Sequence, residues 1–584
     1  MKSETENLPL IFQERVKEFG NRPALLSHDD EDIQAISWFE FGRLVREFAL
    51  GLSSMGVGTG ERMAILSENR PEWIISDLAI QAIGSISVPI YSTLTPKEIE
   101  FILLDSGAST IIISDAHQYK KIAGIKDGVP SLKRIIGFDV EGEEVVSMKS
   151  VMAVGMDEKD DAFLNLRIHG IKADNIATII YTSGTTGRPK GVMLSHKNLI
   201  SNIRASLNQI IVKSDDLYLS FLPMSHIFER MIHHLMIHQG ATIAYSKGFA
   251  SVGADVAFFK PTVMAGVPFL FQRIKEKIIE SVKKGGFVKS KLFSWAYGKG
   301  KERLATDSNH LFSRAAERLV LKKIRDRINP RLRYFISGGA PLPKEVGEFF
   351  WALGIPLLEG YGLTETSPVV SVNSLNAVKL GTVGKPISGV EVKIGSDGEI
   401  QVKGPNVMKG YWNMPEATKE VIKDGWFSTG DTGSIDKDGF LIITDRKKDI
   451  IITALGKNVA PQRLETLLRQ SRYIKDAVIF GDKKPHLVAL IVPELERLKE
   501  YSNGMEISYD NDKELINDKR IYRFYEDIVH KMLKDLARFE QIRRFALISE
   551  LTQDTGELTP TLKIKRRVVE EKYKSVIDEL YAAL

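Results

Sequence analysis

The chain has 584 residues, no cysteine and a formal net charge of only +5. The absence of cysteine excludes disulfides, thiolate metal sites and a cysteine nucleophile, and so small a net charge gives no reason to expect nucleic acid as a partner. The length exceeds what one hydrophobic core usually organises, so we expect at least two domains.

The N-terminus is polar and acidic and lacks the apolar core of a signal peptide. No stretch reaches the roughly 18 uninterrupted apolar residues that a membrane span needs. We therefore expect a cytoplasmic protein, which could contact a membrane only peripherally, at its inner face.

The first third of the chain alternates strand and helix patterns. Short apolar runs at 63–66, 87–91 and 110–114 predict strands, and the apolar spacing within 72–84 and 96–104 predicts helices between them. Strands separated by helices of this length form parallel or mixed sheets that helices cover on both faces. The predicted fold class is therefore α/β.

The alternating pattern resumes at 175–181 and at 334–337. Further along, the charged run 445–449 lies between apolar segments and is typical of a linker. The residues beyond it mix strand and helix patterns and are of normal size for a small domain. We predict a large N-terminal domain over 1–446 and a small, mobile α+β domain over 447–584.

A basic segment interrupts the N-terminal domain at about 273–333. It contains 18 Lys and Arg against six Asp and Glu, a net charge of +12, so the rest of the chain carries −7. Such runs are often solvated helix faces. Apolar residues among the lysines are also typical of helices that bind a membrane surface, and both interpretations stay open. The apolar residues in question are Phe287, Leu292, Phe293, Trp295 and Tyr297.

The strongest chemical motif covers 181–191, directly after a predicted strand, and is rich in glycine and hydroxyl side chains. Such a loop presents many backbone N–H donors, which suit the oxygens of a polyphosphate. It is not a Walker A loop, because Lys190 follows Pro189 and no Ser or Thr comes next. A surface loop of small polar residues is the alternative. The candidate phosphate contacts are Thr182, Ser183, Gly184, Thr185, Thr186, Gly187 and Lys190.

This loop resembles the phosphate-binding motif of the adenylate-forming superfamily, which includes acyl-CoA synthetases, peptide-synthetase adenylation domains and firefly luciferase. Four further motifs follow in the family's order over the full chain. Residues 361–367 resemble its Mg-ATP segment, 428–431 its ribose-binding segment, 445–449 its interdomain hinge and 559–566 its C-terminal lysine segment. The resemblance implies that ATP and Mg²⁺ are used to convert a carboxylic acid into an acyl-adenylate.

The resemblance also implies roles for individual residues in the ATP site. Glu365 and Thr185 would hold Mg²⁺, Thr185 and Thr364 would contact phosphate, and Asp431 would accept hydrogen bonds from the ribose hydroxyls. Asp431 taken alone could equally be a turn residue. Two segments would enclose adenine, with Tyr361 as the stacking face. Their members are Gly338, Gly339, Ala340, Glu359, Gly360, Tyr361 and Gly362.

The C-terminal segment contains two candidates for the family's mobile lysine. The family's usual ending is Gly-Lys followed by an apolar, a variable and a basic residue, and this pattern selects Lys563, with Leu562 in place of the glycine. Lys565 is the alternative, and an exposed basic strand without catalytic role is another. The resemblance further implies that Lys448 is the hinge residue and that Arg446 contacts ribose or phosphate.

Two segments indicate the acid and the acceptor. Residues 222–230 and 455–462 resemble the versions found in long-chain fatty acyl-CoA synthetases. There, His226 would lie beside the carboxylate and the incoming thiol, although a structural histidine is the alternative. Amino-acid activators carry an Asp after this position to hold the ammonium group, whereas this chain has Ile227. An unpaired buried ammonium is costly, so we expect an apolar acyl chain.

We therefore expect an AMP-forming long-chain fatty acid–CoA ligase, with coenzyme A as co-substrate. Transfer to an acyl carrier protein, a catalytically silent fatty-acid-binding protein on the same fold and a luciferase-like oxygenase are the alternatives. The pattern leaves the oligomeric state open, a homodimer included.

Overall fold

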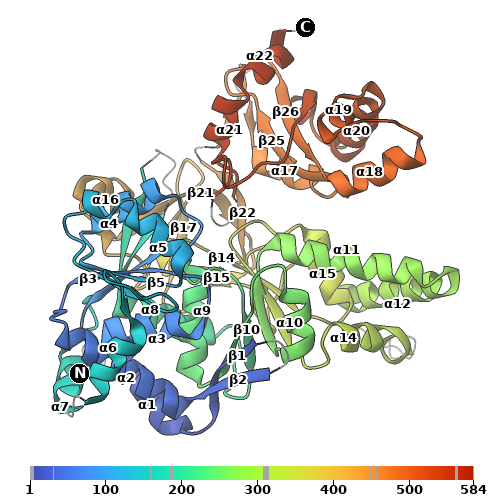
Figure 1. Cartoon of the computed structure of the whole chain (residues 1–584). Helices are drawn as coiled ribbons and strands as arrows, with labels where there is room; N and C mark the ends of the chain where they lie inside the picture. The colour runs from blue at the N-terminus through green and yellow to red at the C-terminus, as the bar shows by residue number, and fades with distance from the viewer. Residues whose placement is uncertain are drawn as a thin grey trace. The chain divides into compact units, whose positions relative to one another are not determined.

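The computed structural model describes residues 6–29, 32–157, 161–182, 188–306, 315–447, 449–454, 457–559 and 563–582. The chain divides into two compact units (Figure 1). The first consists of Met1–Lys393, Gln401–Ser428 and Asp436–Leu441, and the second of Ile394–Ile400, Thr429–Ile435 and Ile442–Leu584. Mixed sheets with flanking helices confirm the predicted α/β fold class. The domain boundary at 446/447 stays a prediction.

The first sheet of unit 1 has eight strands, and its centre is parallel and rich in buried β-branched residues. The strands predicted at 63–66, 87–91 and 110–114 are confirmed as β3, β4 and β5. Helices α4 (Pro96–Ser106) and α5 (Ala116–Ala123) cover one face and α3 (Pro71–Ala82) covers the other (Figure 1). In spatial order the strands are β19 (Gly410–Tyr411), β9 (Lys190–Ser195), β8 (Ile176–Thr182), β4 (Ile86–Ile90), β3 (Arg62–Leu66), β5 (Thr110–Ile113), β6 (Arg134–Gly137) and β7 (Val146–Ser147).

The second sheet has nine strands, parallel in the middle and antiparallel at both ends. Its core is aromatic: the rings of Phe271, Phe335 and Phe350 pack with centroids 5.1 to 6.1 Å apart and are almost fully buried. The spatial order is β16 (Lys385–Pro386), β15 (Val369–Val372), β14 (Leu357–Gly362), β13 (Tyr334–Ser337), β12 (Val263–Gly266), β10 (Leu217–Ser220), β11 (Thr242–Tyr245), β1 (Pro23–Asp29) and β2 (Asp32–Ser37).

Local sequence explains where many helices begin and end. In α4, for example, Thr95 and Glu98 form a capping box, and Gly107 ends the helix in the left-handed conformation that glycine tolerates. Among the described residues, the α-helices of unit 1 are α1 (Leu8–Phe19), α2 (Trp38–Ser54), α3 (Pro71–Ala82), α4 (Pro96–Ser106), α5 (Ala116–Ala123), α6 (Met148–Asp157), α7 (Asp161–Gly170), α8 (His196–Leu207), α9 (Ile227–Gln239), α10 (Val252–Phe259), α11 (Pro268–Lys284), α12 (Phe287–Thr306), α14 (Lys322–Ile328), α15 (Lys344–Ala352) and α16 (Pro415–Val421).

The basic segment forms α11, α12 and α14, and it corrects one expectation. Of the five apolar residues expected to share a surface, only Phe287 and Leu292 are exposed. Phe293, Trp295 and Tyr297 are half-buried and pack against the aromatic core. The reason is helical periodicity, since residues four apart share a face: the rings of Phe293 and Tyr297 stack with centroids 5.9 Å apart.

Unit 2 is built around a three-stranded sheet of β25 (Ile474–Phe480), β26 (Leu487–Pro493) and β27 (Ile542–Leu547). Apolar clusters cover both of its faces. Its helices are α17 (Pro461–Leu468), α18 (Leu495–Gly504), α19 (Asp512–Asn517), α20 (Lys519–Leu533), α21 (Arg566–Lys572) and α22 (Lys574–Ala582). A separate sheet has the order β17 (Glu391–Ile394), β18 (Glu399–Lys403), β21 (Trp426–Ile435) and β20 (Ile422–Lys423), with β22 (Leu441–Arg446) beside β21.

Candidate active site

The phosphate-loop motif connects the two strands of an antiparallel hairpin. Thr182, at the end of β8, is the register partner of Lys190, at the start of β9. A side chain at the next position, Gly191, would meet Ile179 Cγ2 at 2.8 Å, so glycine allows the close packing there. The structure thus brings Thr182 and Lys190 together. The other loop candidates, which lie outside the described residues, are Ser183, Gly184, Thr185, Thr186 and Gly187.

A tyrosine that sequence analysis missed joins two of the predicted residues. The Tyr411 hydroxyl donates a hydrogen bond to Glu365 Oε1 at 3.0 Å, and Lys190 Nζ lies 4.9 Å from the centroid of the Tyr411 ring. Burial, and next the Glu365 carboxylate, raise the pKa of Tyr411, so its hydroxyl stays a donor. Pairing of β19 with β9 places Tyr411 opposite Val192. The only local sequence feature that could have indicated Tyr411 is the Gly-Tyr-Trp run at 410–412.

The segments predicted to enclose adenine also come together. Gly338 to Ala340 follow β13, whose last residue Ser337 pairs with Glu359 on β14. The backbone N–H of Leu342 donates to Glu359 Oε1 at 3.0 Å. Burial raises the pKa of Glu359 to about 8. The loop after β13 and the strand β14 therefore form one continuous wall.

Two glycines of this wall have structural reasons to be glycine. At Gly339 the backbone adopts a φ of +81°, which disfavours any side chain. At Gly362 a Cβ would lie 1.9 Å from the carbonyl oxygen of Pro368. In the antiparallel pair with β15, Gly360 lies opposite Val372 and Tyr361 opposite Ser371. Thr364 and Glu365 follow directly, in a single 3-10 turn.

His226 precedes α9 and caps its start. Its Nδ1 accepts a hydrogen bond from the backbone N–H of Phe228 at 3.2 Å, which leaves Nε2 as the protonated nitrogen of the neutral ring. The Phe228 ring lies against Gly338, where a Cβ would be 3.1 Å from Phe228 Cζ. Ile227 is buried. The start of α9 thus adjoins the predicted adenine wall.

A fully buried ion pair, which sequence analysis missed, joins α9 to α3. Arg230 Nη2 lies 2.6 Å from Asp77 Oδ1, and both side chains are 0% exposed. The Arg230 guanidinium also donates to Thr178 Oγ1 at 2.6 Å and to Ser87 Oγ at 2.7 Å. Burial alone would raise the pKa of Asp77, but Arg230 lowers it below its ordinary value. One arginine therefore ties α9 to α3, β4 and β8.

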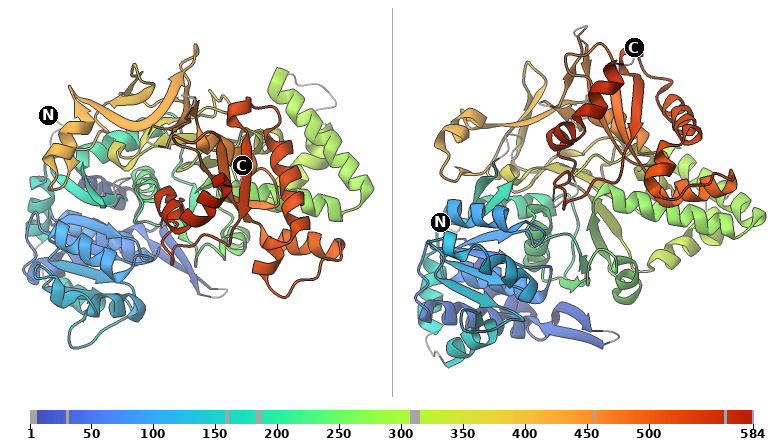
Figure 2. Two further views of the ribbon diagram at one scale, coloured as in Figure 1. Left: turned by 90° about the horizontal axis from the view of Figure 1, so that it is seen from above. Right: turned by 45° about the horizontal axis from the view of Figure 1, so that its top comes forward.

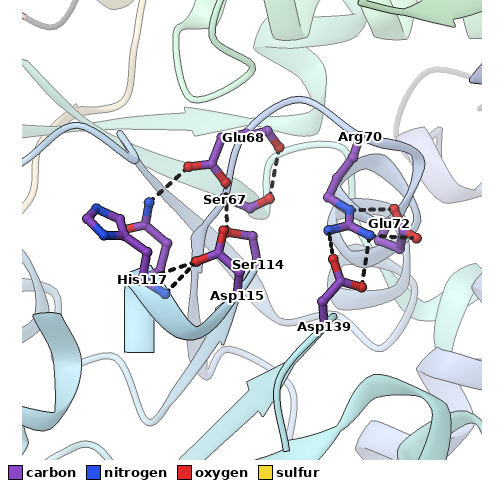
Figure 3. Close-up of polar contacts among 9 residues, drawn as sticks. Ser67, Glu68, Arg70, Glu72, Ser114, Asp115, His117 and Asp139 are labelled. Atoms are coloured by element: carbon purple, nitrogen blue, oxygen red, sulfur yellow. Dashed lines mark hydrogen bonds and ion pairs between the residues drawn. The ribbon is translucent and has the colours of Figure 1, made fainter. Parts of the chain in front are cut away.

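A polar cluster lies where β3 and β5 end (Figure 3). Glu68 accepts hydrogen bonds from Ser114 Oγ at 2.7 Å and from Gln118 Nε2 at 2.9 Å. Asp115 caps α5 through the backbone N–H groups of His117 and Gln118. These contacts join the ends of β3 and β5 to the start of α5, so the cluster acts as a structural brace.

The loop after β3, which contains Glu68, also contacts the segment before His226 and helps to hold that segment in place. Figure 3 shows Arg70 between Glu72 and Asp139. Arg70 Nε lies 2.8 Å from Glu72 Oε2, and Arg70 Nη1 lies 2.5 Å from Asp139 Oδ2. Asn69 lies between Glu68 and Arg70 in the sequence. Its side chain donates a hydrogen bond to Ser220 Oγ at 2.9 Å and accepts one from the backbone N–H of Met224 at 2.9 Å. Asn69 is therefore a further residue that sequence analysis missed.

In unit 2, two of the predicted nucleotide contacts adjoin. Asp431 lies on β21, and Arg446 ends the neighbouring β22, with Arg446 Nε 3.6 Å from Asp431 Oδ1. The turn before Asp431 is held by Glu399, whose Oε1 accepts from Gly430 N at 2.9 Å. Lys447 Nζ contacts the other oxygen of Glu399 at 2.8 Å. The predicted hinge, Lys448, lies outside the described residues.

The C-terminal lysines differ in their settings. Lys563 is exposed, and its N–H donates to Thr559 Oγ1 at 2.9 Å while its carbonyl oxygen accepts from the N–H of Thr559 at 2.8 Å. Lys565 is half-buried; its N–H donates to Glu557 O at 2.7 Å, and α21 begins at the next residue. That next residue, Arg566, is anchored to Glu465 Oε1 at 2.7 Å. The side chain of Lys563 is therefore the more exposed of the two.

Comparison with known proteins identifies the family. Residues 12–412 match the model described as AMP-binding enzyme, and residues 448–584 match the model described as AMP-binding enzyme C-terminal domain. The chain belongs to the AMP-binding enzyme family. This bears out the resemblance to adenylate-forming enzymes, since the two models together cover nearly the whole chain.

Curated relatives are similar along most of their length. The chain is 36% identical over 556 residues to the long-chain-fatty-acid–CoA ligase FadD15 of Mycobacterium bovis, covering 93% of this chain and 91% of the relative. It is 32% identical over 601 residues to the peroxisomal long chain acyl-CoA synthetase 7 of Arabidopsis thaliana, covering 95% and 83%. The adenylation domain of a Mycobacterium chelonae carboxylate reductase has the same fold, with a TM-score of 0.79, 20% identity and coverage of 99% and 91%.

The donor set of this AMP-binding enzyme fits Mg²⁺ held largely by substrate. Within the described part of the chain, no group of three or more His, Asp or Glu side chains could hold a metal ion. Mg²⁺ often binds through one or two carboxylates plus substrate phosphates. Glu365 is a single carboxylate bonded to Tyr411, whose ring contacts Lys190, so it fits a Mg²⁺ ion that takes its other ligands from substrate phosphates.

Proposed function

We propose that this chain is an AMP-forming long-chain fatty acid–CoA ligase. A carboxylate oxygen of the acid attacks the α-phosphorus of ATP, and the bond to pyrophosphate breaks. The thiol sulfur of coenzyme A then attacks the acyl carbon, the bond to AMP breaks, and the thiol proton leaves. The observation that carries this proposal is similarity to long-chain ligases over 93% and 95% of the chain, together with the nucleotide-site motifs.

In the first step the protein supplies position and charge rather than covalent chemistry. Lys190 and the hydroxyls of Thr182, Thr185 and Thr364 bind the β- and γ-phosphates. Glu365, with Thr185, would hold Mg²⁺, which when bound neutralises charge on the phosphates. The Tyr411 hydrogen bond and the Lys190 contact with its ring support a common phosphate site.

Adenosine is held by the wall and by the residues on β21 and β22. Gly338 to Ala340 and Glu359 to Gly362 enclose adenine, with Tyr361 against its face. Asp431 accepts hydrogen bonds from the ribose hydroxyls, and Arg446, 3.6 Å from it, supports that carboxylate and contacts ribose or phosphate.

Lys563 is the lysine that meets the α-phosphate during adenylation. Its exposed side chain suits a cation that must reach a substrate, whereas Lys565 is half-buried. His226 adjoins the acyl carbon and the incoming thiol, with Nε2 as the nitrogen able to contact them.

The Tyr411→Phe variant tests the common phosphate site. It removes one hydrogen bond to a carboxylate, a contact of about 1.5–3 kcal/mol, so ATP–pyrophosphate exchange should fall about tenfold or more. The loss should be partly offset by excess Mg²⁺, because Glu365 would then be poorly positioned rather than absent. Tyr119→Phe, which removes an exposed hydroxyl bonded to Glu144 at 2.9 Å, is the matched control. Equal activity of both variants would contradict the role of Tyr411.

Lys448→Pro tests the hinge. Proline fixes φ and blocks backbone rotation without touching the nucleotide site. Adenylation should continue, while thioester formation should fall at least about tenfold and acyl-adenylate should accumulate on the enzyme. Rapid-quench analysis of the bound intermediate measures both. Full turnover in this variant would remove Lys448 from the hinge role.

The function itself is tested by ATP–pyrophosphate exchange with acids from acetate to long-chain fatty acids, and with amino acids. Exchange that depends on a long apolar acid supports the proposal, whereas exchange with amino acids alone refutes it. Coenzyme A and acyl carrier protein are then offered as acceptors in parallel. A silent fatty-acid-binding protein would bind the acid without exchange.

We place this ligase in the cytoplasm, in contact with the inner face of the membrane. None of the helices in the described ranges combines the length and hydropathy needed to cross a bilayer. A homodimer is kept as an alternative to the monomer, and sedimentation equilibrium distinguishes the two.

A further inference from the structure

The helices α11 and α12 form an arm whose tip carries an unusual surface. Figures 1 and 2 show the two helices side by side, with their connecting turn at the end far from the nine-stranded sheet. The connection is short: Gly285 and Gly286 lie between Lys284, which ends α11, and Phe287, which begins α12. The tip is therefore a tight turn held by two packed helices.

Apolar side chains lie exposed at this tip. Phe287, the first residue of α12, is 73% exposed and Val288 is 77% exposed, whereas other apolar residues of the two helices, such as Ile278 and Phe293, pack against the core. One turn along α12, Leu292 is 42% exposed. Exposed apolar side chains that lie together, with polar residues around them, are typical of a protein or membrane interaction site.

The tip is also strongly basic. From 281 to 301 the sequence contains six lysines and no aspartate or glutamate. Lys283, Lys284, Lys289 and Lys291 are all exposed. Lys284 Nζ contacts Glu280 on the same helix at 3.2 Å but keeps 77% of its side chain exposed. Lys291 Nζ lies 4.6 Å from the centroid of the Phe287 ring, so charge and apolar surface are interleaved.

We infer that this tip, defined by residues 283–292, docks on the surface of an anionic lipid bilayer. The exposed Phe287 and Val288 enter the boundary between headgroups and acyl chains, and the four lysines contact anionic headgroups. The packed inner residues of the arm keep the tip rigid, so little ordering is needed on binding. The biological reason for docking rests on the proposed function, because a long-chain fatty acid partitions into bilayers.

The test uses the full chain and vesicles in the absence of ATP, so that it stands apart from the reaction. Vesicles of phosphatidylglycerol and phosphatidylcholine should co-sediment the protein at low salt, and vesicles of phosphatidylcholine alone should not. Each lysine near an anionic surface contributes about fivefold. The variant with Lys283, Lys284, Lys289 and Lys291 changed to Gln should therefore bind about 100-fold more weakly or worse.

Matched controls distinguish an effect of the tip from an effect of net charge on vesicle binding. The variant with Lys513, Lys519, Lys531 and Lys534 changed to Gln removes the same charge from exposed positions in unit 2. Phe287→Ser with Val288→Ser should weaken binding about tenfold, whereas Leu166→Ser, at a residue 76% exposed on α7, should have no effect. Circular dichroism checks that every variant is folded.

A fluorescent probe locates the contact. Because the chain has no cysteine, Val288→Cys provides a single site for an environment-sensitive dye, with Leu166→Cys as its counterpart. The dye at 288 should shift to the blue on mixing with anionic vesicles, and the dye at 166 should not. The inference is overturned by any of three results: no binding at low salt, equal losses in the two lysine variants, or no shift at 288. The last is what a tip that binds an acidic protein would show.

Discussion

Replacement of Lys563 by alanine is expected to abolish adenylate formation while thioester formation from synthetic acyl-adenylate continues. Removing one group that stabilises developing charge costs about 10²–10³-fold in rate. Lys563 is needed at the α-phosphate only in the first step, so the second step should keep most of its rate. ATP–pyrophosphate exchange measures the first step, and release of AMP from added acyl-adenylate and coenzyme A measures the second.

Lys565→Ala is the matched control for this experiment. It removes the same charge two residues away, from a half-buried side chain directly before α21, and should leave exchange within a few-fold of wild type. If Lys565→Ala abolishes exchange and Lys563→Ala does not, the assignment passes to Lys565. Equal loss of both half-reactions in a folded Lys563→Ala protein would contradict the proposed role.

The second large effect is expected from Asp77→Ala, which leaves the Arg230 guanidinium buried without its partner. Breaking such a pair costs about 3–5 kcal/mol, and here both side chains are 0% exposed. Urea unfolding followed by tryptophan fluorescence measures the free energy of unfolding of unit 1. All six tryptophans of the sequence lie in that unit, so unfolding of unit 2 does not interfere.

Two controls show that the loss comes from the buried charge. Glu416→Ala breaks an exposed pair, with Lys419 Nζ 2.9 Å from Glu416 Oε1, and should cost less than about 1 kcal/mol. Asp77→Leu combined with Arg230→Met removes both charges and should recover part of the stability lost in Asp77→Ala. If Asp77→Ala and Glu416→Ala lose the same free energy, the ion pair does not hold α9 to α3.

Much of the fold and part of the site could be predicted because their patterns are local. Runs such as 63–66 and 110–114 are strands because short apolar segments between helices fit the buried centre of a parallel sheet. Motifs such as 181–191 could be recognised for a related reason. A loop binds phosphate largely through its own backbone, so its residues must be contiguous.

The apolar residues of the basic segment show where local reading fails. Phe293, Trp295 and Tyr297 were expected on the surface with Phe287 and Leu292, but they pack against the aromatic core. The sequence places all five among lysines. Which face of α12 meets the core depends on neighbouring elements such as α15, where Phe349 lies 5.7 Å from the Tyr297 ring.

By itself, the sequence determined the fold class, the family and the kind of reaction, because contiguous motifs encode loops and strands that act through their own backbone. Only the tertiary structure decided which distant side chains support those motifs. Tyr411 meets Glu365 across 46 positions, and Arg230 meets Asp77 across 153. The physical reason is that a hydrogen bond or ion pair depends on distance in space. That distance is set by how the two sheets and their helices pack, and no local pattern records it.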